Sequence, residues 1–533
     1  MIITLSPTTK NSTPNIVRAL AKIQSAGGGE LHFEPGEYHF FKEGTEKAFF
    51  AVSNNCACDK HMVFPILDMR DTVIDGHGSL FVFHDVVFPF MISNSKNISI
   101  RNITVDTGRS PLVEFRIHGI SEDGFYMDID REASPFFIEN GSLCFKRESE
   151  NVLGTETLFS LHALGRHKVQ YFATGDCGAD MSNLPTLLMK CDVSETPTGI
   201  YARYRADTPA RCRYGEEIVT SIIDGGRNVD VICLDRSEDI RLSNITVARG
   251  IGMGIVGQLS KNILIDGFST DIQYHIGSHQ TLTADALHFI NCDGSLEITN
   301  CTLSDTMDDA LNVHGMYTVL AKTQKNTIRS QIGHQEQQYF NPYRTGDRLE
   351  IIDNTTFEVV AEFVTDSACF DEGSGTELMI NGHFTYGEAC CREGFWIENP
   401  DRMPNLHLHH NHFYNFPHNR ISGGGEILVE ENRFSDCKAA LMCLDLARYW
   451  YESGRVKHLV YRNNILENCD TAVRIGVDGV SDEEAPKIHQ KIEIVGNRFS
   501  GIQDCAIRAS GVSELILKDN VFDTDRKDLF KIM

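Results

Sequence analysis

A short phrase of alternating apolar and polar residues that ends in Asn recurs along this sequence, and it constrains the fold more than any other feature. The intervals between successive phrase-ending Asn residues from Asn411 to Asn520 are 21, 32, 33 and 23 residues. Short strands that repeat every 20–35 residues, without long helices between them, are typical of a right-handed parallel β-helix. Each Asn is expected at a turn, because Asn tolerates the left-handed backbone region. The phrases are KNISIRNITV (96–105), EDIRLSNITV (238–247), KNILIDGFST (261–270), GSLEITNCTL (294–303), LHHNHF (408–413), LVEENRF (428–434), VYRNNIL (460–466), IEIVGNRF (492–499) and LILKDNVF (515–522).

The N-terminal segment predicts a helix that covers the end of this solenoid. Thr13 is a candidate cap and Pro14 suits the first helical position, while Ile16, Leu20 and Ile23 share one face. A run of three glycines ends the helix, and ELHFEPGEYHF then reads as a first strand and turn. This opening, continued by VIDGHG, resembles the N-terminal cap of pectinase-like β-helix proteins.

Two stretches lack the repeated phrase and carry hairpin signals instead, so we expect two small β-barrel-like insertions in an all-β chain. The expected organisation is a cap with the first coils (1–111), a first insertion (112–225), central coils (226–315), a second insertion (316–400) and C-terminal coils (401–533).

Composition excludes several classes of protein. A net charge of −25 repels polyphosphate, which argues against a nucleic-acid partner, and 41% hydrophobic residues indicate a globular chain. No apolar run reaches the roughly 18 residues of a membrane helix, so no membrane insertion is expected. The start, MIITLSPTTK, lacks the pattern of a secretion signal, which favours the cytoplasm unless a signal was removed.

Sixteen Cys are too dilute for a disulfide framework in 533 residues. Cys56-Ala-Cys58 with His61 could be half a metal site, but no second pair stands at the required spacing, so we expect reduced thiols and no metal. The cysteines at 437, 469 and 505 follow successive phrases and are expected to stack along the core.

The strongest chemical signal is a pair of matching phrases, TADALHF (283–289) and MDDALNVHG (307–315). Their alignment places Asp285 over Asp309, with Asp308 beside it, and equivalent positions of adjacent coils lie about 4.8 Å apart. One Asp at such a turn is commonly structural, but three stacked carboxylates repel by about 3 kcal/mol per pair at an effective dielectric of about 20. That repulsion favours one protonated and one ionised carboxyl group, which is what glycoside hydrolysis requires.

The β-helix opening, the single Asp and the Asp-Asp pair 23 and 24 residues later together resemble glycoside hydrolase family 110. The resemblance implies an exo-acting α-1,3-galactosidase that removes terminal galactose from blood-group-B-type or linear α-galactosyl glycans by inversion, with no cofactor or metal. It implies that Asp285 is the general acid, and that Asp308 and Asp309 position and deprotonate the attacking water.

Further polar or aromatic residues could contact galactose, although each also has a structural interpretation. Three of them flank the aspartates, two adjoin the glycines of HNRISGGGE (418–426), and one is a tryptophan where the second insertion ends. These candidates are His288, Asn312, His314, Arg420, Glu426 and Trp396.

Two other functions stay open. A polygalacturonase-like hydrolase shares the β-helix and the Asp arrangement, but here His314-Gly315 follows the Asp pair by only five residues and no Gly-His-Gly stands downstream. A non-catalytic carbohydrate-binding β-helix would not need clustered carboxylates. The partner expected in either hydrolase case is a glycan, and insertions projecting from a solenoid also offer surfaces for a homodimer.

Overall fold

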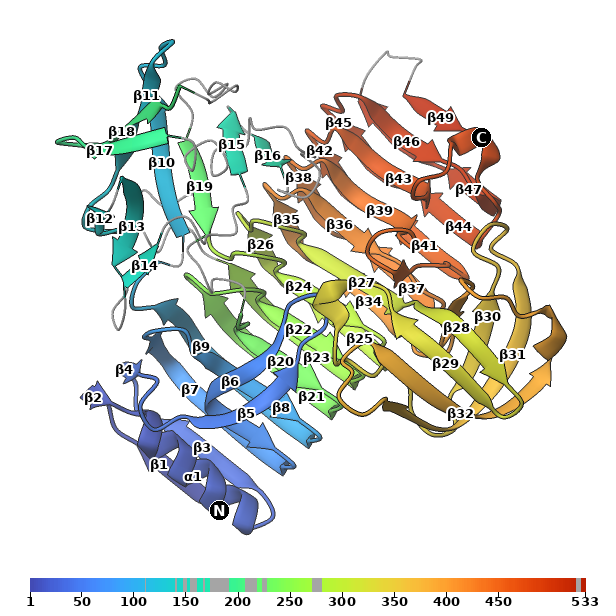
Figure 1. Ribbon diagram of the computed structural model, residues 1–533, viewed down its shortest axis with the longest axis horizontal. Helices are drawn as coiled ribbons and strands as arrows, with labels where there is room; N and C mark the ends of the chain where they lie inside the picture. Colours follow the sequence, from blue (N-terminus) through green and yellow to red (C-terminus); the bar gives the residue numbers. More distant parts are fainter. Residues whose placement is uncertain are drawn as a thin grey trace.

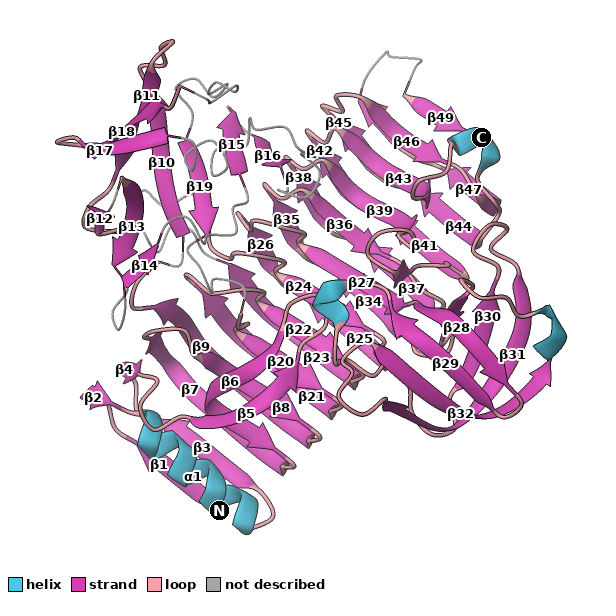
Figure 2. Cartoon of the chain, in the orientation of Figure 1, coloured by secondary structure: helices cyan, strands magenta, loops and turns pink. Residues whose placement is uncertain are grey.

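The computed structural model describes residues 1–110, 112–139, 141–146, 151–153, 161–165, 168–172, 191–206, 218–222, 228–270, 280–523 and 529–533. Within these residues the chain is a parallel β-helix whose coils stack from the blue N-terminal end to the red C-terminal end, with the two termini at opposite ends (Figure 1). Strands dominate throughout (Figure 2). The predicted all-β fold class, with its capping helix and insertions, is confirmed.

The walls of the solenoid are two parallel sheets, and each C-terminal coil contributes one strand to the smaller sheet and two strands, separated by a bend, to the larger one. Apolar side chains from both sheets point inward and form one continuous core from Ile16 to Leu529. The larger sheet contains β1 (Ile2–Leu5), β2 (Thr8–Asn11), β3 (Gly29–Phe33), β4 (Glu37–Phe40), β7 (Arg70–Phe83), β9 (Lys96–Thr107), β21 (Glu238–Val247), β23 (Lys261–Thr270), β25 (Asp293–Thr299), β26 (Thr302–Ser304), β34 (Asn405–His409), β35 (His412–Tyr414), β37 (Glu426–Glu430), β38 (Arg433–Ser435), β41 (His458–Arg462), β42 (Ile465–Glu467), β44 (His489–Val495), β45 (Arg498–Ser500), β47 (Val512–Lys518) and β48 (Val521–Asp523).

The smaller sheet carries the strands that matter for function. Its strands are parallel along the coils, with two exceptions. The first strand, β5, pairs antiparallel with β6, and the short strand β40 pairs antiparallel with β27. Its members are β5 (Glu46–Ala51), β6 (Ala57–Leu67), β8 (Phe88–Ser93), β20 (Ile232–Asp235), β22 (Ile255–Gln258), β24 (Leu287–Ile290), β27 (Leu311–Met316), β36 (His418–Ile421), β39 (Ala439–Asp445), β40 (Glu452–Ser453), β43 (Thr471–Val477), β46 (Cys505–Ala509) and β49 (Phe530–Ile532).

Helix α1 (Thr13–Ser25) covers the N-terminal end of the core. Ile16, Leu20 and Ile23 are buried on one face, as predicted, and the glycines that follow adopt positive φ. The predicted cap is one residue off, because the helix begins at Thr13 and Ser12 is its N-cap. The backbone N–H of Thr13 is instead satisfied by Asn11 Oδ1 at 2.9 Å, and Thr13 Oγ1 donates to the carbonyl of Phe41.

The predicted first insertion, 112–225, is described only in part, and its remaining residues lie outside the described part of the chain. Its described strands form a seven-stranded antiparallel sheet and a separate three-stranded one. The strands are β10 (Leu112–His118), β11 (Gly124–Ile129), β15 (Leu161–Gly165), β16 (Lys168–Phe172), β17 (Cys191–Glu195), β18 (Gly199–Tyr204) and β19 (Ile218–Ile222) in the first, and β12 (Phe136–Glu139), β13 (Ser142–Lys146) and β14 (Asn151–Leu153) in the second.

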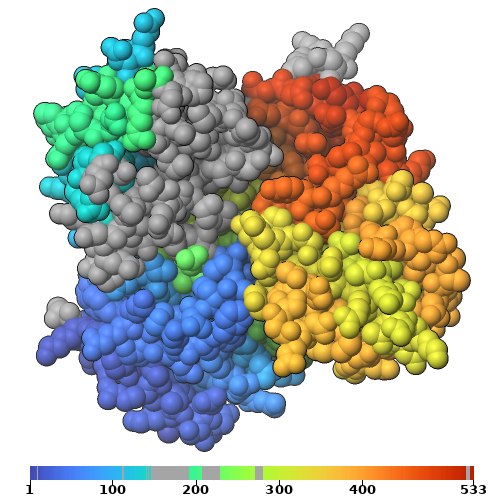
Figure 3. Space-filling model, in the orientation of Figure 1, coloured from blue at the N-terminus to red at the C-terminus, as the bar shows by residue number. Residues whose placement is uncertain are grey.

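A closed six-stranded barrel leaves the solenoid after β27 and returns to it before β34. Alternate residues of its strands, among them Leu320, Ile328, Leu349 and Phe363, form a separate hydrophobic core. In the space-filling view the blue N-terminal segment and the yellow and orange barrel lie side by side, and little green is visible between them (Figure 3). The barrel strands are β28 (Thr318–Gln324), β29 (Thr327–Ile332), β30 (Arg348–Ile352), β31 (Val359–Phe370), β32 (Glu377–Tyr386) and β33 (Trp396–Glu398); the short 3₁₀ helices η3 (Gln335–Gln337), η4 (Glu388–Cys390) and η5 (Asp482–Glu484) lie in connecting loops.

The phrase-ending Asn residues of the C-terminal coils form a buried ladder rather than the left-handed turn positions that we predicted. Each side-chain amide donates to the Asn Oδ1 of the next coil, at 2.9–3.1 Å, from Asn411 through Asn432, Asn464 and Asn497 to Asn520. The positive φ belongs to the preceding residue, which turns the chain so that the Asn side chain points inward. In the earlier coils Asn102, Asn244 and Asn300 themselves carry the positive φ.

The ladder predicts a large loss of stability when an interior member is removed. Asn464→Ala deletes an acceptor for the backbone and side-chain N–H groups of Asn432 and a donor to the carbonyl of Val429. Because these groups are buried, we expect the free energy of unfolding to fall by about 2–4 kcal/mol. A urea titration measures this. Asn405→Ala removes one exposed hydrogen bond, from the backbone N–H of Glu426, and should lower the unfolding free energy by no more than about 1 kcal/mol; an equal loss in both variants would contradict the ladder's importance.

The predicted stacking of thiols is confirmed for one pair and wrong for the third cysteine. Cys437 and Cys469 are buried in adjacent coils, with their Sγ atoms 3.2 Å apart. Cys505 pairs in register with Thr471, so it lies two residues away from the Cys437–Cys469 column.

No helix in the described ranges has the length and apolar character required to cross a membrane.

Candidate active site

The register of the smaller sheet brings the predicted aspartates together. Leu287 of β24 pairs with Leu311 of β27, so Asp285 and Asp309, two residues earlier in each coil, occupy equivalent positions. The backbone N–H of Ala286 donates to the carbonyl of Asp309 at 2.9 Å, which ties the two turns together. The matching phrases therefore predict the register of these coils correctly.

Asp309 is a buried carboxylate held by two basic side chains from β36. Its Oδ2 lies 2.6 Å from Arg420 Nε, and its Oδ1 lies 3.0 Å from His418 Nδ1. Burial raises the pKa of Asp309, but the charge of Arg420 and the hydrogen bond from His418 outweigh it and hold that pKa below its ordinary value. Asp309 is therefore ionised at neutral pH.

Asp285 ends a chain of hydrogen bonds that runs through two buried imidazoles. Its Oδ2 lies 2.8 Å from His288 Nδ1, His288 Nε2 lies 3.0 Å from His314 Nε2, and His314 Nδ1 lies 2.6 Å from the carbonyl oxygen of Gly315. Burial lowers the pKa of His314 to about 4 and also lowers the pKa of His288, against the pull of nearby carboxylates. Both rings are therefore neutral at pH 7.

The directions of the hydrogen bonds place one proton between Asp285 and His288. A carbonyl oxygen only accepts, so His314 carries its proton on Nδ1 and accepts on Nε2. His288 must then donate from Nε2, which leaves its Nδ1 as an acceptor. The contact between His288 Nδ1 and Asp285 therefore holds one proton, and the neutral ring of His288 leaves this proton on Asp285.

Asp308 is the least buried of the three aspartates. Its Oδ1 accepts from the backbone N–H of Asp309 at 3.1 Å, and its carbonyl accepts from Thr306 Oγ1. The acidic groups all act on Arg420: burial lowers the pKa of its guanidinium, but Asp309, Glu452, Asp308 and Asp285 together hold it above its ordinary value. One half-buried cation thus lies among four carboxyl groups.

Two residues of this cluster were missed by the sequence analysis. His418 stands two residues before Arg420, so the period of a strand places both side chains on the same side. Glu452 comes from β40; its Oε1 accepts from Asn54 Nδ2 at 2.7 Å and lies 3.7 Å from His314 Nε2. That spacing could have predicted His418, whereas no local sequence pattern predicts Glu452, because its partners are far away in sequence.

The predicted galactose-binding residues fall into two groups. Asn312 pairs in register with both His288 and Arg420, so these residues and His314 lie within the aspartate cluster. Trp396 lies elsewhere: it is 5% exposed and packs against Tyr317 and Phe357, so its ring faces are covered by neighbouring side chains.

Glu426 is also apart from the cluster. It belongs to β37 of the larger sheet, where its exposed carboxylate pairs with His458 Nδ1 at 2.6 Å. The run of three glycines separates it from Arg420 on the other sheet.

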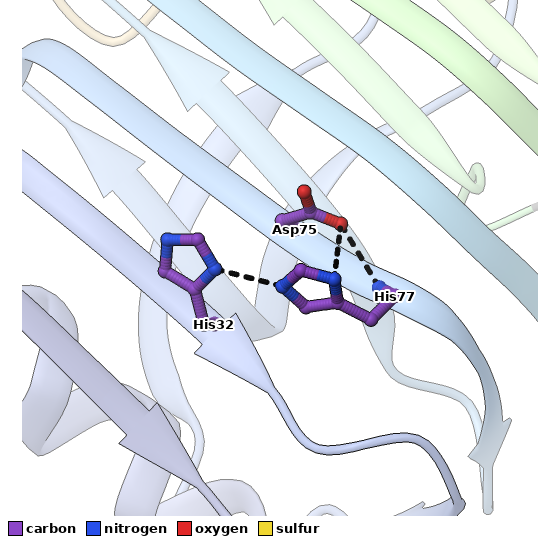
Figure 4. A group of neighbouring side chains, drawn as sticks. All are labelled: His32, Asp75 and His77. Carbon is purple, nitrogen blue, oxygen red and sulfur yellow. Dashed lines mark hydrogen bonds and ion pairs between the residues drawn. The ribbon is translucent and has the colours of Figure 1, made fainter.

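In the part of the chain that the structure describes, two groups of side chains outside the cluster have the composition of metal ligands. One comprises His32, Asp75 and His77 on the larger sheet, where His32 Nδ1 and His77 Nε2 lie 2.8 Å apart (Figure 4). Its Asp75 carboxylate already binds Arg101 at 2.7 Å and Asn102 at 3.0 Å, which makes it a poor ligand. The other comprises Glu297, His407 and His409; His409 pairs with Glu297 at 3.4 Å, and His407 pairs with Glu430 of an adjacent coil at 3.0 Å. Neither group adjoins the aspartates in sequence or sheet.

A parallel β-helix with carboxyl groups in opposite protonation states on neighbouring coils is an arrangement suited to acid–base chemistry on a substrate.

The similarity of the chain to known proteins points to a more specific group. No family model matches the chain. It is 25% identical over 558 residues to α-1,3-galactosidase A of Shewanella woodyi, covering 98% of this chain and 85% of that protein. It is 26% and 24% identical to enzymes named α-1,3-galactosidase B from Phocaeicola vulgatus and Bacteroides thetaiotaomicron, covering 98% and 97% of this chain and 85% and 84% of theirs.

Among solved structures, an exopolygalacturonase from Thermotoga maritima matches with a TM-score of 0.39 at 9% identity, covering 99% of this chain and 93% of that one. The fold described above rests on the strand pairing of the chain itself.

Proposed function

We propose that this protein is a glycoside hydrolase that removes terminal α-1,3-linked galactose from glycans by an inverting mechanism. The observation that carries the proposal is that Asp285, in contact with the neutral His288, and the ionised Asp309 occupy equivalent positions of neighbouring coils. The near full-length similarity to enzymes named α-1,3-galactosidases supports the choice of substrate.

In the proposed reaction Asp285 is the general acid. It donates its proton to the glycosidic oxygen as the bond from that oxygen to the galactose anomeric carbon breaks. His288 and His314 act as positioning residues, because their tautomers keep the proton on Asp285 before the reaction. Asp285 then takes up a new proton from solvent after the aglycone leaves.

Asp308 and Asp309 act on the opposite face of the sugar. They orient a water molecule and take one of its protons while its oxygen attacks the anomeric carbon, so the released galactose is the β anomer. Arg420 and His418 keep Asp309 ionised for this role. Asn312 is proposed to contact galactose hydroxyl groups from the same cluster.

An assay on α-1,3-, α-1,4- and α-1,6-linked galactosides, with and without a neighbouring fucose, tests the proposal. We expect galactose release from the α-1,3-linked compounds only, including blood-group-B-type and linear ends. Release from polygalacturonate with none from any α-galactoside would replace it with a polygalacturonase-like activity. Binding without turnover, unchanged in Asp308→Asn and Asp309→Asn, would indicate a carbohydrate-binding protein.

A further inference from the structure

A group of thiols and an amine lies on the hairpin formed by β5 and β6, apart from the proposed catalytic aspartates. Cys56, Cys58 and Lys60 alternate along the strand, so their side chains share one face, whereas His61 points to the other face and contacts Thr45 Oγ1. This alternation explains why the pattern of two Cys and a His does not converge on one point.

The three side chains on the shared face are in direct contact. The Sγ atoms of Cys56 and Cys58 lie 3.4 Å apart, and Lys60 Nζ lies 3.1 Å from Cys56 Sγ. Lys60 is fully buried and also donates to the carbonyl of Asn228. Among the described residues no carboxylate lies within ion-pair distance of this ammonium group, so the anion best placed to balance its charge is the ionised dithiol, whose two sulfur atoms share one proton.

Of the two sulfur atoms that share this proton, Cys58 has the lower pKa. The hydrogen bond from Cys56 lowers the pKa of Cys58 to about 6, opposed by burial and assisted by Lys60. The same contact, with burial, raises the pKa of Cys56, so Cys56 stays a thiol. The other charged groups that act on this site are Asp59, which raises the pKa of Cys58, and Asp230, which acts on Lys60.

The Cys437–Cys469 pair is an internal comparison. Its Sγ separation of 3.2 Å is almost the same, but both cysteines are fully buried and burial raises the pKa of Cys437 well above its ordinary value. Cys56 and Cys58, in contrast, are only partly buried and have a cation beside them. The distance between the sulfur atoms therefore does not distinguish the two pairs, whereas the neighbouring positive charge and the solvent exposure of the thiols do.

We propose that Cys56 and Cys58, with Lys60, form a redox-reactive dithiol site that reacts with hydroperoxides. The Cys58 thiolate attacks one peroxide oxygen, the O–O bond breaks, and with hydrogen peroxide a hydroxide leaves and takes up a proton as water. Cys58 is then a sulfenic acid. The Cys56 sulfur attacks Cys58 Sγ, the S–O bond breaks, and a second water leaves. Overall two thiols lose two hydrogens and two electrons to the peroxide, and a Cys56–Cys58 disulfide forms.

Alkylation kinetics test the first requirement of this site. At pH 5 a thiol of pKa about 6 is about 300-fold more ionised than one of about 8.5, and its lower intrinsic nucleophilicity reduces this advantage about 15-fold. Iodoacetamide should therefore modify Cys58 of the folded protein about 20-fold faster at pH 5 than the same residue in the urea-unfolded chain. Lys60→Met should lose most of this advantage, and modification of native Cys58 at the unfolded rate would overturn the proposal.

Peroxide treatment of the full chain, followed by mass spectrometry, tests the second requirement. We expect the peptide that contains Cys56 and Cys58 to lose two hydrogens while Cys437 and Cys469 stay reduced. In Cys56→Ser a Cys58 sulfenic acid should accumulate and be trapped by dimedone, and Cys58→Ser should form neither product. Oxidation of Cys437 and Cys469 at least as fast as Cys56 and Cys58 would overturn the proposal, and circular dichroism confirms that each variant is folded.

Discussion

Asp285→Asn is expected to lower kcat/KM for an α-1,3-galactosyl disaccharide by about 10²–10⁴-fold, the usual contribution of a general acid. The same variant should lose less than about tenfold on dinitrophenyl α-galactoside, because a phenolate of low pKa leaves without needing a proton. Initial rates on the two substrates measure this difference. It arises because Asp285 is the carboxyl group that the His288–His314 chain keeps protonated.

Asp309→Asn is the matched comparison, since the ionised carboxylate acts on water and not on the leaving group. It should lose activity on both substrates by a similar factor, and Asn is nearly isosteric with Asp, so circular dichroism should be unchanged. The opposite pattern would exchange the acid and base roles. In that pattern Asp285→Asn loses kcat/KM by the same factor on both substrates, whereas Asp309→Asn loses much less on the dinitrophenyl compound than on the disaccharide.

Arg420→Met is expected to reduce the free energy of unfolding by about 3–5 kcal/mol at pH 7, because it leaves the buried Asp309 charge without its cation. Urea titration measures the loss. The pKa of Asp309 lies below its unfolded value, so the stabilisation is present above the unfolded pKa of about 3.9 and is lost as pH falls through the folded pKa. The difference between wild type and variant should therefore shrink at low pH.

A double-mutant cycle separates the ion pair from other effects of the Arg420 side chain. Arg420→Met combined with Asp309→Asn removes both charges and should be more stable than Arg420→Met alone. If the double variant lost the sum of the two single losses, the 2.6 Å contact would carry no coupling energy.

Local repetition predicts much of this architecture because a β-helix places residues of successive coils at fixed positions. The phrases DALHF and DALNV fix the register of β24 on β27, and with it the position of Asp285 over Asp309. The buried role of the ladder was not predictable from Asn alone. Both an inward-pointing Asn and a left-handed Asn satisfy the same alternating pattern, and the preceding residue decides between them.

The rest of the site depends on contacts between distant segments. Asn54 and Glu452 are 398 residues apart, yet they share a hydrogen bond beside His314. Glu426 and Trp396 show that closeness in sequence is not enough. Glu426 follows Arg420 by six residues but is exposed and paired with His458, and Trp396 lies near the end of the barrel but is covered by Tyr317, so neither side chain reaches the aspartates. Their predicted contact with galactose stays a prediction.

The proposed mechanism requires water to attack the anomeric carbon from the side opposite Asp285. Proton NMR of galactose released from an α-1,3-galactoside, recorded before mutarotation, measures the configuration of the first product. We predict the β anomer, with the α anomer rising only later. An α anomer as first product would require a covalent intermediate on one of the aspartates and would contradict the roles assigned to Asp285, Asp308 and Asp309.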